Sequence, residues 1–164
     1  MCIERFYKQR AVNIAVLGSY SLPNWYDPEG NLRTFECSTV RLSPFQVLVE
    51  APVVGRVGDR ITSYFSEFGE LDGSISDTRQ DSFLLELELT RMRRTWMAEK
   101  LAWVEKRQKD CSLLDVREDA RFVPPTSHST LILADGTVQR CLIIDVSCSG
   151  VAVLAEYDPP IGTP

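Results

Sequence analysis

The chain has 164 residues and is 44% hydrophobic, enough to bury a core, which excludes a disordered or collagen-like chain. Its 18 Lys and Arg against 23 Asp and Glu give a net charge of −5, and this argues against general nucleic-acid binding, which needs a cationic surface. No apolar run exceeds five residues and the first residues lack a secretory signal, so we expect a cytoplasmic protein without a membrane span.

Short β-rich stretches come first in the chain. Apolar and β-branched residues alternate or cluster at residues 13–17, 35–42, 47–50, 61–65 and 83–89. Gly and Pro separate these stretches at residues 28–31 and 52–58, as they do in turns between antiparallel strands. The pattern predicts a mainly β fold, built as a small barrel or sandwich.

A helix is predicted at about residues 91–109, where the sequence has no Gly or Pro and is rich in helix formers. At about 100° per residue its apolar side chains form two stripes. These are Met92, Trp96 and Trp103 on one stripe, and Met97, Leu101 and Val104 on the other. Two stripes indicate two partners, the preceding strands and a second domain or subunit; the alternative is a single broad face on one core.

Charge and cysteine content narrow the possible chemistry. Residues 67–88 hold seven carboxylates and one Arg, whereas residues 91–109 hold seven basic residues and two Glu. The five Cys show no C-x2-C spacing and there is one His, so we expect no metal site. No P-loop, G-x-S-x-G motif or nucleophile with an orienting base is present, so we expect no catalytic residue and no enzyme activity.

An internal repeat links the two halves of the chain. With a shift of 104 residues, residues 37–58 align with residues 141–162 without a gap, with six identical pairs among 22. Ser43 meets Ser147, for example, and Val49 meets Val153. This indicates one fold used twice. Because few residues follow the second copy, we expect its barrel to be incomplete and to be closed by copy one or by another subunit.

Two polar motifs in the second copy go beyond what a strand pattern requires. Arg117 and Arg121 form an RxxxR pair, and Asp145, Ser147 and Gly150 form a D-x-S-x-x-G motif that leads directly into an apolar strand. In this order the motifs resemble the PilZ domain family. The resemblance covers about residues 110–164, and a weaker PilZ-like pattern is present in residues 1–109.

The resemblance implies two six-stranded antiparallel barrels joined by the helix at about 91–109. The first, in residues 1–109, is a degenerate PilZ-like domain that includes the helix. The second, in residues 110–164, is a truncated PilZ domain that carries both motifs. The resemblance also implies that the ligand is cyclic di-GMP, a bacterial second messenger, with no separate cofactor.

The chemistry of the motif residues agrees with such a ligand. The guanidinium groups of Arg117 and Arg121 suit bidentate binding of phosphate oxygens or of guanine O6 and N7. Asp145 can accept hydrogen bonds from the guanine N1–H and N2–H2 groups, and Ser147 adds a hydroxyl. Gly150 either lets the ligand approach the backbone or supplies a turn or bulge that needs positive φ, and both roles are compatible.

The first copy departs from the motif. Arg41 and Gln46 align with Asp145 and Gly150, and only Ser43 is retained. We therefore expect a cyclic di-GMP receptor that binds through its second domain and transmits the ligand level by loop ordering and domain reorientation. The alternative is a PilZ-like adaptor that binds no nucleotide and acts through a protein partner or as a homo-oligomer.

Overall fold

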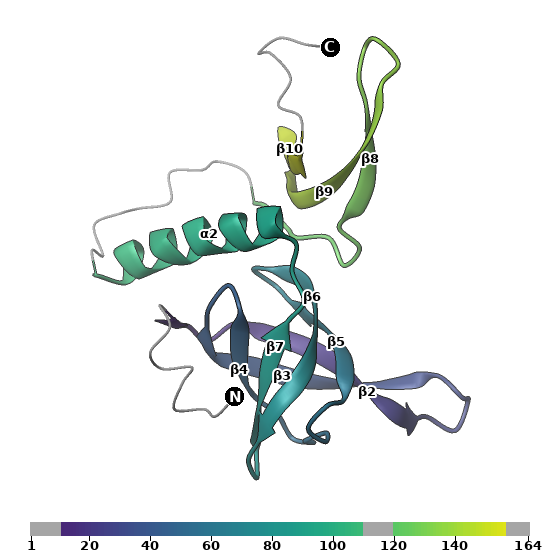
Figure 1. Cartoon of the computed structure of the whole chain (residues 1–164), viewed down its shortest axis with the longest axis vertical. Helices are drawn as coiled ribbons and strands as arrows, with labels where there is room; N and C mark the ends of the chain where they lie inside the picture. Colours follow the sequence, from purple (N-terminus) through teal and green to yellow (C-terminus); the bar gives the residue numbers. More distant parts are fainter. Residues whose placement is uncertain (1–10, 110–119, 157–164) are drawn as a thin grey trace. The chain divides into compact units, whose positions relative to one another are not determined.

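The computed structural model describes residues 11–109 and 120–156, and the chain divides into two compact units, Met1–Asp115 and Val116–Pro164. Each described part has a sheet of its own, with strands β1 to β7 in unit 1 and β8 to β10 in unit 2 (Figure 1). Within the described residues, no helix combines the length and the apolar character needed to cross a membrane.

Unit 1 contains a closed antiparallel barrel of six strands. Its sheet has the order β1-β3-β2-β5-β6-β7-β4, and a further pairing of β3 with β4 joins the two ends into a ring. The short β1 extends the sheet beside β3. This confirms the mainly β fold and one six-stranded barrel. The strands are β1 (Val12–Asn13), β2 (Leu17–Tyr26), β3 (Leu32–Leu42), β4 (Gln46–Glu50), β5 (Arg60–Phe65), β6 (Gly69–Thr78) and β7 (Ser82–Leu87).

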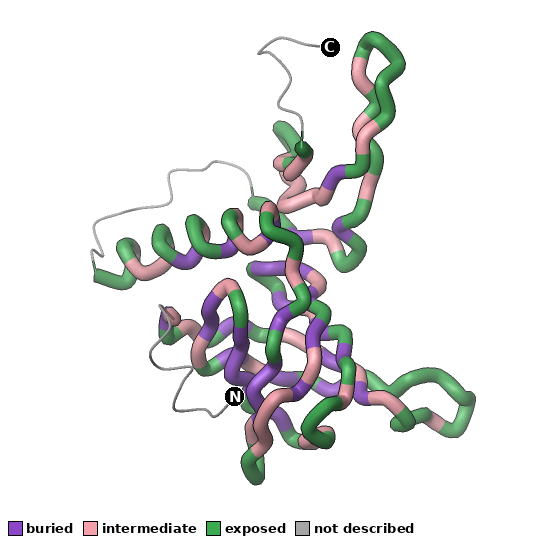
Figure 2. Tube along the Cα trace, viewed as in Figure 1, coloured by how far each residue is buried: buried purple, intermediate pink, exposed green. Residues whose placement is uncertain are grey.

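Alternating side chains fill the interior of this barrel. In β6, for example, Gly69, Leu71, Gly73 and Ile75 are buried while the residues between them are not. Tyr20 and Phe83 pack edge to face at the centre, with ring centroids 5.3 Å apart. Figure 2 shows the buried positions concentrated in the barrel strands, whereas the projecting end of the β2–β3 hairpin is mostly exposed. The hydrophobic core of unit 1 is therefore the barrel interior.

The β1–β2 region corrects the prediction of a single strand at residues 13–17. The structure has two strands there, with a break at residues 14–16. The buried Thr39 accounts for the break, because its hydroxyl donates to the carbonyl of Ile14 at 2.5 Å and accepts from the N–H of Val16 at 2.9 Å. Hydrogen bonds to the Thr39 hydroxyl thus take the place of the backbone hydrogen bonds of a regular strand pair at this position.

Strand β2 was predicted only at its first residue, Leu17, and strand β6 was not predicted at all. The β6 sequence GELDGSISDT contains two Gly and three acidic residues, which are poor strand formers. Gly73 is needed because strand β7 passes close by: a Cβ at this position would lie 2.3 Å from the carbonyl oxygen of Glu86. Packing within the barrel therefore outweighs the weak strand propensity of this segment.

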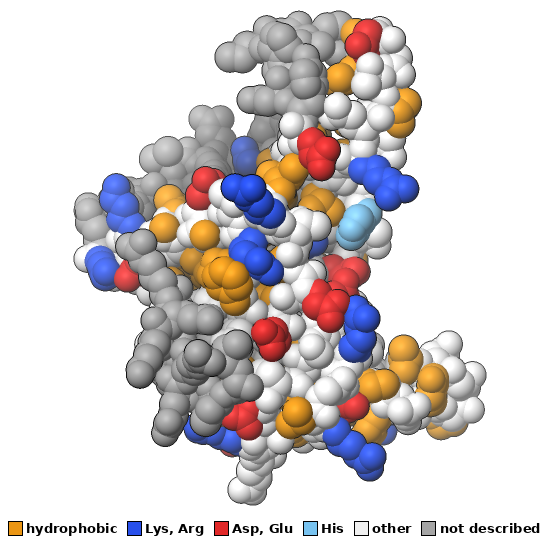
Figure 3. All heavy atoms as spheres, in the orientation of Figure 1, with side chains coloured by type: hydrophobic (Ala, Val, Ile, Leu, Met, Phe, Trp, Pro, Cys, Tyr) orange, Lys and Arg blue, Asp and Glu red, His pale blue; other side chains and the backbone are white. Residues whose placement is uncertain are grey.

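The helix α2 (Arg91–Lys109) occupies the predicted residues. Thr90 caps it, since the Thr90 hydroxyl accepts a hydrogen bond from the N–H of Arg93 at 3.3 Å. Trp96 from one predicted stripe and Met97, Leu101 and Val104 from the other pack against the same core. This agrees with a single broad face, from which Trp103 is left 43% exposed. On the face drawn in Figure 3, Lys and Arg side chains lie along α2.

Arg93 fixes α2 to the barrel by a polar contact. Its side chain is buried, and its guanidinium donates to the carbonyl of Phe68 at 3.2 Å and to the carbonyl of Glu70. Burial lowers the pKa of Arg93, and the nearby Glu70 and Asp72 act in the opposite direction. Truncation of Arg93 would leave two carbonyl groups without this donor.

Unit 2 does not show the second barrel that the sequence led us to expect. Its strands β8 (His128–Ile132), β9 (Val138–Ser147) and β10 (Gly150–Ala155) form an open antiparallel sheet with β9 in the centre. Within the described residues, β8 and β10 are edge strands that do not pair further.

The internal repeat is visible in the geometry of two hairpins. The pairs Ser38↔Glu50 and Arg41↔Leu48 of β3–β4 recur, with the shift of 104 residues, as Leu142↔Leu154 and Asp145↔Ala152 of β9–β10. Each hairpin also has one irregularity at the same place, because the registers skip the equivalent residues 40 and 144. The two halves thus share a hairpin with one register and one bulge.

A core truncation tests the barrel packing. We expect Phe83→Ala to lower the free energy of unfolding by about 3–5 kcal/mol, because Phe83 is fully buried and its removal leaves a cavity beside Tyr20. Urea denaturation followed by circular dichroism measures this change. Val57→Ala, at a residue 63% exposed, serves as the control and should cost less than about 0.5 kcal/mol. Equal effects of the two substitutions would contradict the packing.

The reactivity of the Cys37 thiol tests whether solvent reaches the same core. Burial raises the pKa of Cys37 to about 12, so almost no reactive thiolate exists at pH 8. We expect N-ethylmaleimide to modify the exposed Cys148 at least about tenfold faster than Cys37, as measured by peptide-resolved mass spectrometry. In urea the two rates should become similar. Equal rates in the folded protein would show that solvent reaches Cys37.

Candidate functional site

The structure brings together one residue from each of the two motifs. The guanidinium Nη1 of Arg121 lies 2.8 Å from the carboxylate Oδ1 of Asp145, which is the distance of a charge-assisted hydrogen bond. The two side chains are 39% and 22% exposed. The pair is therefore accessible from solvent, and both groups can exchange this contact for a ligand.

A backbone bridge holds Arg121 in place. The next residue, Phe122, pairs with Val146 of β9 through two hydrogen bonds of 3.0 and 2.9 Å. Farther along, the N–H of Ile143 donates to the carbonyl of Ser127 at 2.7 Å, just before β8 begins. Pro124 and Pro125 lie between these contacts and lack the N–H that would continue the ladder. The chain from Arg121 to β8 thus runs along β9.

The hairpin β9–β10 positions the second motif. Asp145 and Ser147 are two residues apart in β9 and so lie on the same face of the sheet. The bulge at residue 144 immediately precedes Asp145, and a bulge changes the direction of the side chains beside it. Ser147 pairs with Gly150 at the end of the hairpin, and its hydroxyl donates to the Gly150 carbonyl at 3.3 Å.

Gly150 lies in open space. A Cβ at this position would meet no heavy atom within 4 Å. Gly150 is also absent from the glycines with positive φ in the described residues, so the turn does not require glycine there. The prediction of a turn with positive φ at Gly150 was therefore wrong. The backbone at Gly150 is exposed, with open space beside it.

Arg117, the other arginine of the RxxxR motif, lies outside the described residues, so its distance from Arg121 and Asp145 is not defined. Phe122 was missed by the sequence analysis; the residue is 60% exposed and follows Arg121 directly, a place suited to stacking of its ring on a planar base. Its position next to the RxxxR motif was the available signal.

Within the described residues, no group of His, Cys, Asp and Glu could hold a metal ion.

The turn at residues 43–46 of unit 1 aligns with the turn at residues 147–150 of unit 2 but is buried. Ser43 and Gln46 are buried, at 0% and 1% exposure. The Ser43 hydroxyl accepts from the N–H groups of Phe45 and Gln46 and donates to the Gln46 carbonyl at 3.2 Å. A closed turn of this kind offers no polar group to a ligand.

The ion pair itself should add little stability. We expect Asp145→Asn to change the free energy of unfolding by less than about 1 kcal/mol, because both side chains are partly solvated. Urea denaturation of the full chain checks this, with Phe83→Ala as the destabilised reference. A loss of more than about 2 kcal/mol would show that Asp145 has a structural role.

No protein-family model matches the chain, and no curated protein matches it. Among solved structures, the chain is similar to that described as the crystal structure of the Borreliella burgdorferi PlzA protein in complex with c-di-GMP. The two share 10% sequence identity with a TM-score of 0.37, over 94% of this chain and 79% of that one. A similarity at this level assigns neither fold nor function to the chain.

Proposed function

We propose that the chain is a cyclic di-GMP receptor and that unit 2 binds the nucleotide through Arg117, Arg121, Asp145, Ser147 and Gly150. The observation that carries the proposal is the 2.8 Å contact between Arg121 and Asp145. Arg121 belongs to the RxxxR motif and Asp145 to the D-x-S-x-x-G motif, and 23 residues separate them in the chain. Their contact joins the two motifs at one place on unit 2, which supports a common role.

The chemistry of binding follows from this contact. Without ligand, Arg121 and Asp145 neutralise each other. In the complex, Arg121 turns to phosphate oxygens or to the O6 and N7 of a guanine, and Asp145 accepts from the guanine N1–H and N2–H2 groups. Ser147 adds a hydroxyl on the same face, and the open space at Gly150 admits the ligand to the backbone. Phe122 offers an exposed ring for stacking a second base.

Transmission of the signal is the remaining part of the proposal. Binding alters the contacts of the segment that carries the two arginines and reorients the two units, which changes what the protein binds next. We place this activity in the cytoplasm and assign no enzymatic step to it.

A second candidate function rests on the open sheet of unit 2. Large apolar side chains are exposed there, at 69% for Ile132, 64% for Val138 and 56% for Val151. Exposed apolar groups beside unpaired strand edges favour contact with another protein or a second copy of the chain. An adaptor of this kind would not need the nucleotide.

Titration calorimetry with cyclic di-GMP separates the two functions. We expect the full chain to bind, and Arg117→Ala and Arg121→Ala each to weaken binding by about 1–3 kcal/mol, or about five- to 150-fold, because each removes bidentate contacts. Arg140→Ala, at an exposed arginine of β9, and Arg41→Asp in unit 1 serve as controls and should bind like the wild type. Wild-type affinity in both motif variants would remove these arginines from the site, and no binding by the wild type would favour the adaptor.

A further inference from the structure

Unit 1 has a surface that the proposed nucleotide site does not use. Leu17, at the start of β2, is 76% exposed, more than any other large hydrophobic residue in the described part of the chain. It borders two hollows. One, here called the α2 groove, lies between the barrel and the second half of α2. The other, here called the acidic hollow, lies on the outside of the barrel over β3 and β4.

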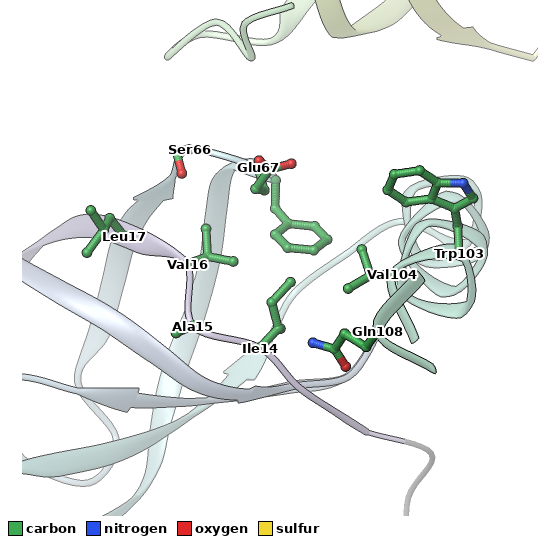
Figure 4. A pocket seen from close by; sticks show the side chains of 10 residues that line it. Ile14, Ala15, Val16, Leu17, Ser66, Glu67, Trp103, Val104 and Gln108 are labelled. Atoms are coloured by element: carbon green, nitrogen blue, oxygen red, sulfur yellow. The ribbon is translucent and has the colours of Figure 1, made fainter. Parts of the chain in front are cut away.

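The α2 groove is mainly apolar and has a volume of about 560 Å³. Figure 4 shows Leu17 near one end and Trp103 near the other, with Val16 and Val104 between them. Trp103 is 43% exposed. The volume is that of a site for a small molecule or for a few side chains of a peptide.

The acidic hollow, of about 400 Å³, carries three carboxylates, Glu36, Glu50 and Asp81. The strand register places Glu50 beside Leu17, because Leu17 pairs with Ser38 and Ser38 pairs with Glu50 in one row across the outer face. Glu36 is two residues from Ser38 and so lies on the same face of β3, and the Asp81 carbonyl accepts from the N–H of Ala51, next to Glu50. All three carboxylates are exposed, and none of them makes an ion pair with a described residue. Among the described residues, no Lys or Arg lines either hollow.

We propose that the α2 groove and the acidic hollow form one docking surface for a basic amphipathic segment of a partner protein. A large apolar side chain of the partner enters the groove between Leu17 and Trp103, and Lys or Arg side chains of the partner bind the carboxylates of the hollow. Leu17 belongs to both hollows, so one continuous segment can occupy both.

The charges on either side of Leu17 set the direction of the partner. The α2 groove is lined by one carboxylate, Glu67, which forms an ion pair with Lys100, whereas the acidic hollow is lined by three, so the hollow attracts the cationic end of the segment more strongly. That end must therefore lie on the side of Glu36 and Glu50. Glu36 lies on the strand next to Leu17, and Glu50 lies two strand spacings, or about 10 Å, from Leu17, which an extended chain covers in about three residues. Nucleic acid and anionic lipid would be repelled by the same carboxylates.

Selection from a phage-displayed library of random 12-residue peptides on the full chain tests the proposal. The enriched peptides should contain a large apolar residue with at least two Lys or Arg within about three residues of it. Fluorescence anisotropy with a labelled enriched peptide then gives Kd values. We expect Leu17→Asp, and separately the triple variant Glu36→Gln, Glu50→Gln and Asp81→Asn, to weaken binding at least about tenfold.

Matched controls separate this surface from general charge and hydrophobicity. Leu32→Asp changes another exposed leucine, and a triple variant with Glu29→Gln, Glu86→Gln and Glu99→Gln changes the net charge equally; both should bind within about twofold of the wild type. If Leu17→Asp fails to fold by circular dichroism, Trp103→Ala takes its place.

Three results would overturn the proposal. The first is enrichment of neutral or acidic peptides, or of none. The second is an enriched peptide that binds all variants equally. The third is a concentration-dependent dimer of the chain alone in analytical ultracentrifugation that Leu17→Asp abolishes, which would assign the surface to a second copy instead.

Discussion

Strand β4 pairs with β3 along one edge and with β7 along the other, and this double pairing closes the barrel. Closure satisfies the backbone groups that an open sheet would leave unpaired, and it creates an interior that the side chains of six strands must fill. The close contacts at Gly18 and Gly73 follow from it, as does the seating of α2 on the core through Met97 and Leu101. The grooved outer surface around Leu17 depends on the same closed frame.

The same hairpin is used differently in the two units. In unit 1 it lies within the closed barrel, and its turn is buried through Ser43 and Gln46. In unit 2 its turn is exposed, and the position of Arg41 is taken by Asp145, which meets Arg121. One backbone geometry thus supports a packed structural turn in one unit and a polar, solvent-accessible site in the other.

Features that depend on nearby residues in the chain could be predicted from the sequence, whereas features that depend on contacts with distant residues could not. The helix at residues 91–109 was predicted correctly because its propensity and its Thr90 cap lie within the segment itself. Strand β6 was missed because its role comes from tertiary pairing around Gly73, and the break before β2 because it depends on the distant Thr39. The motif residues were found from their pattern, but the exposure of Phe122 required the structure.

The β3–β4 and β9–β10 hairpins have a bulge at equivalent positions, residues 40 and 144. Side chains of a strand alternate between its faces, so one inserted or deleted residue would exchange every inward and outward position beyond it. A hairpin with a bulge at a fixed place therefore tolerates exchange of residues but not a change of length. Only six of 22 aligned residues are identical between the copies, yet no gap separates them. The two hairpins thus keep the same length and register, while Arg41 and Asp145 occupy equivalent positions.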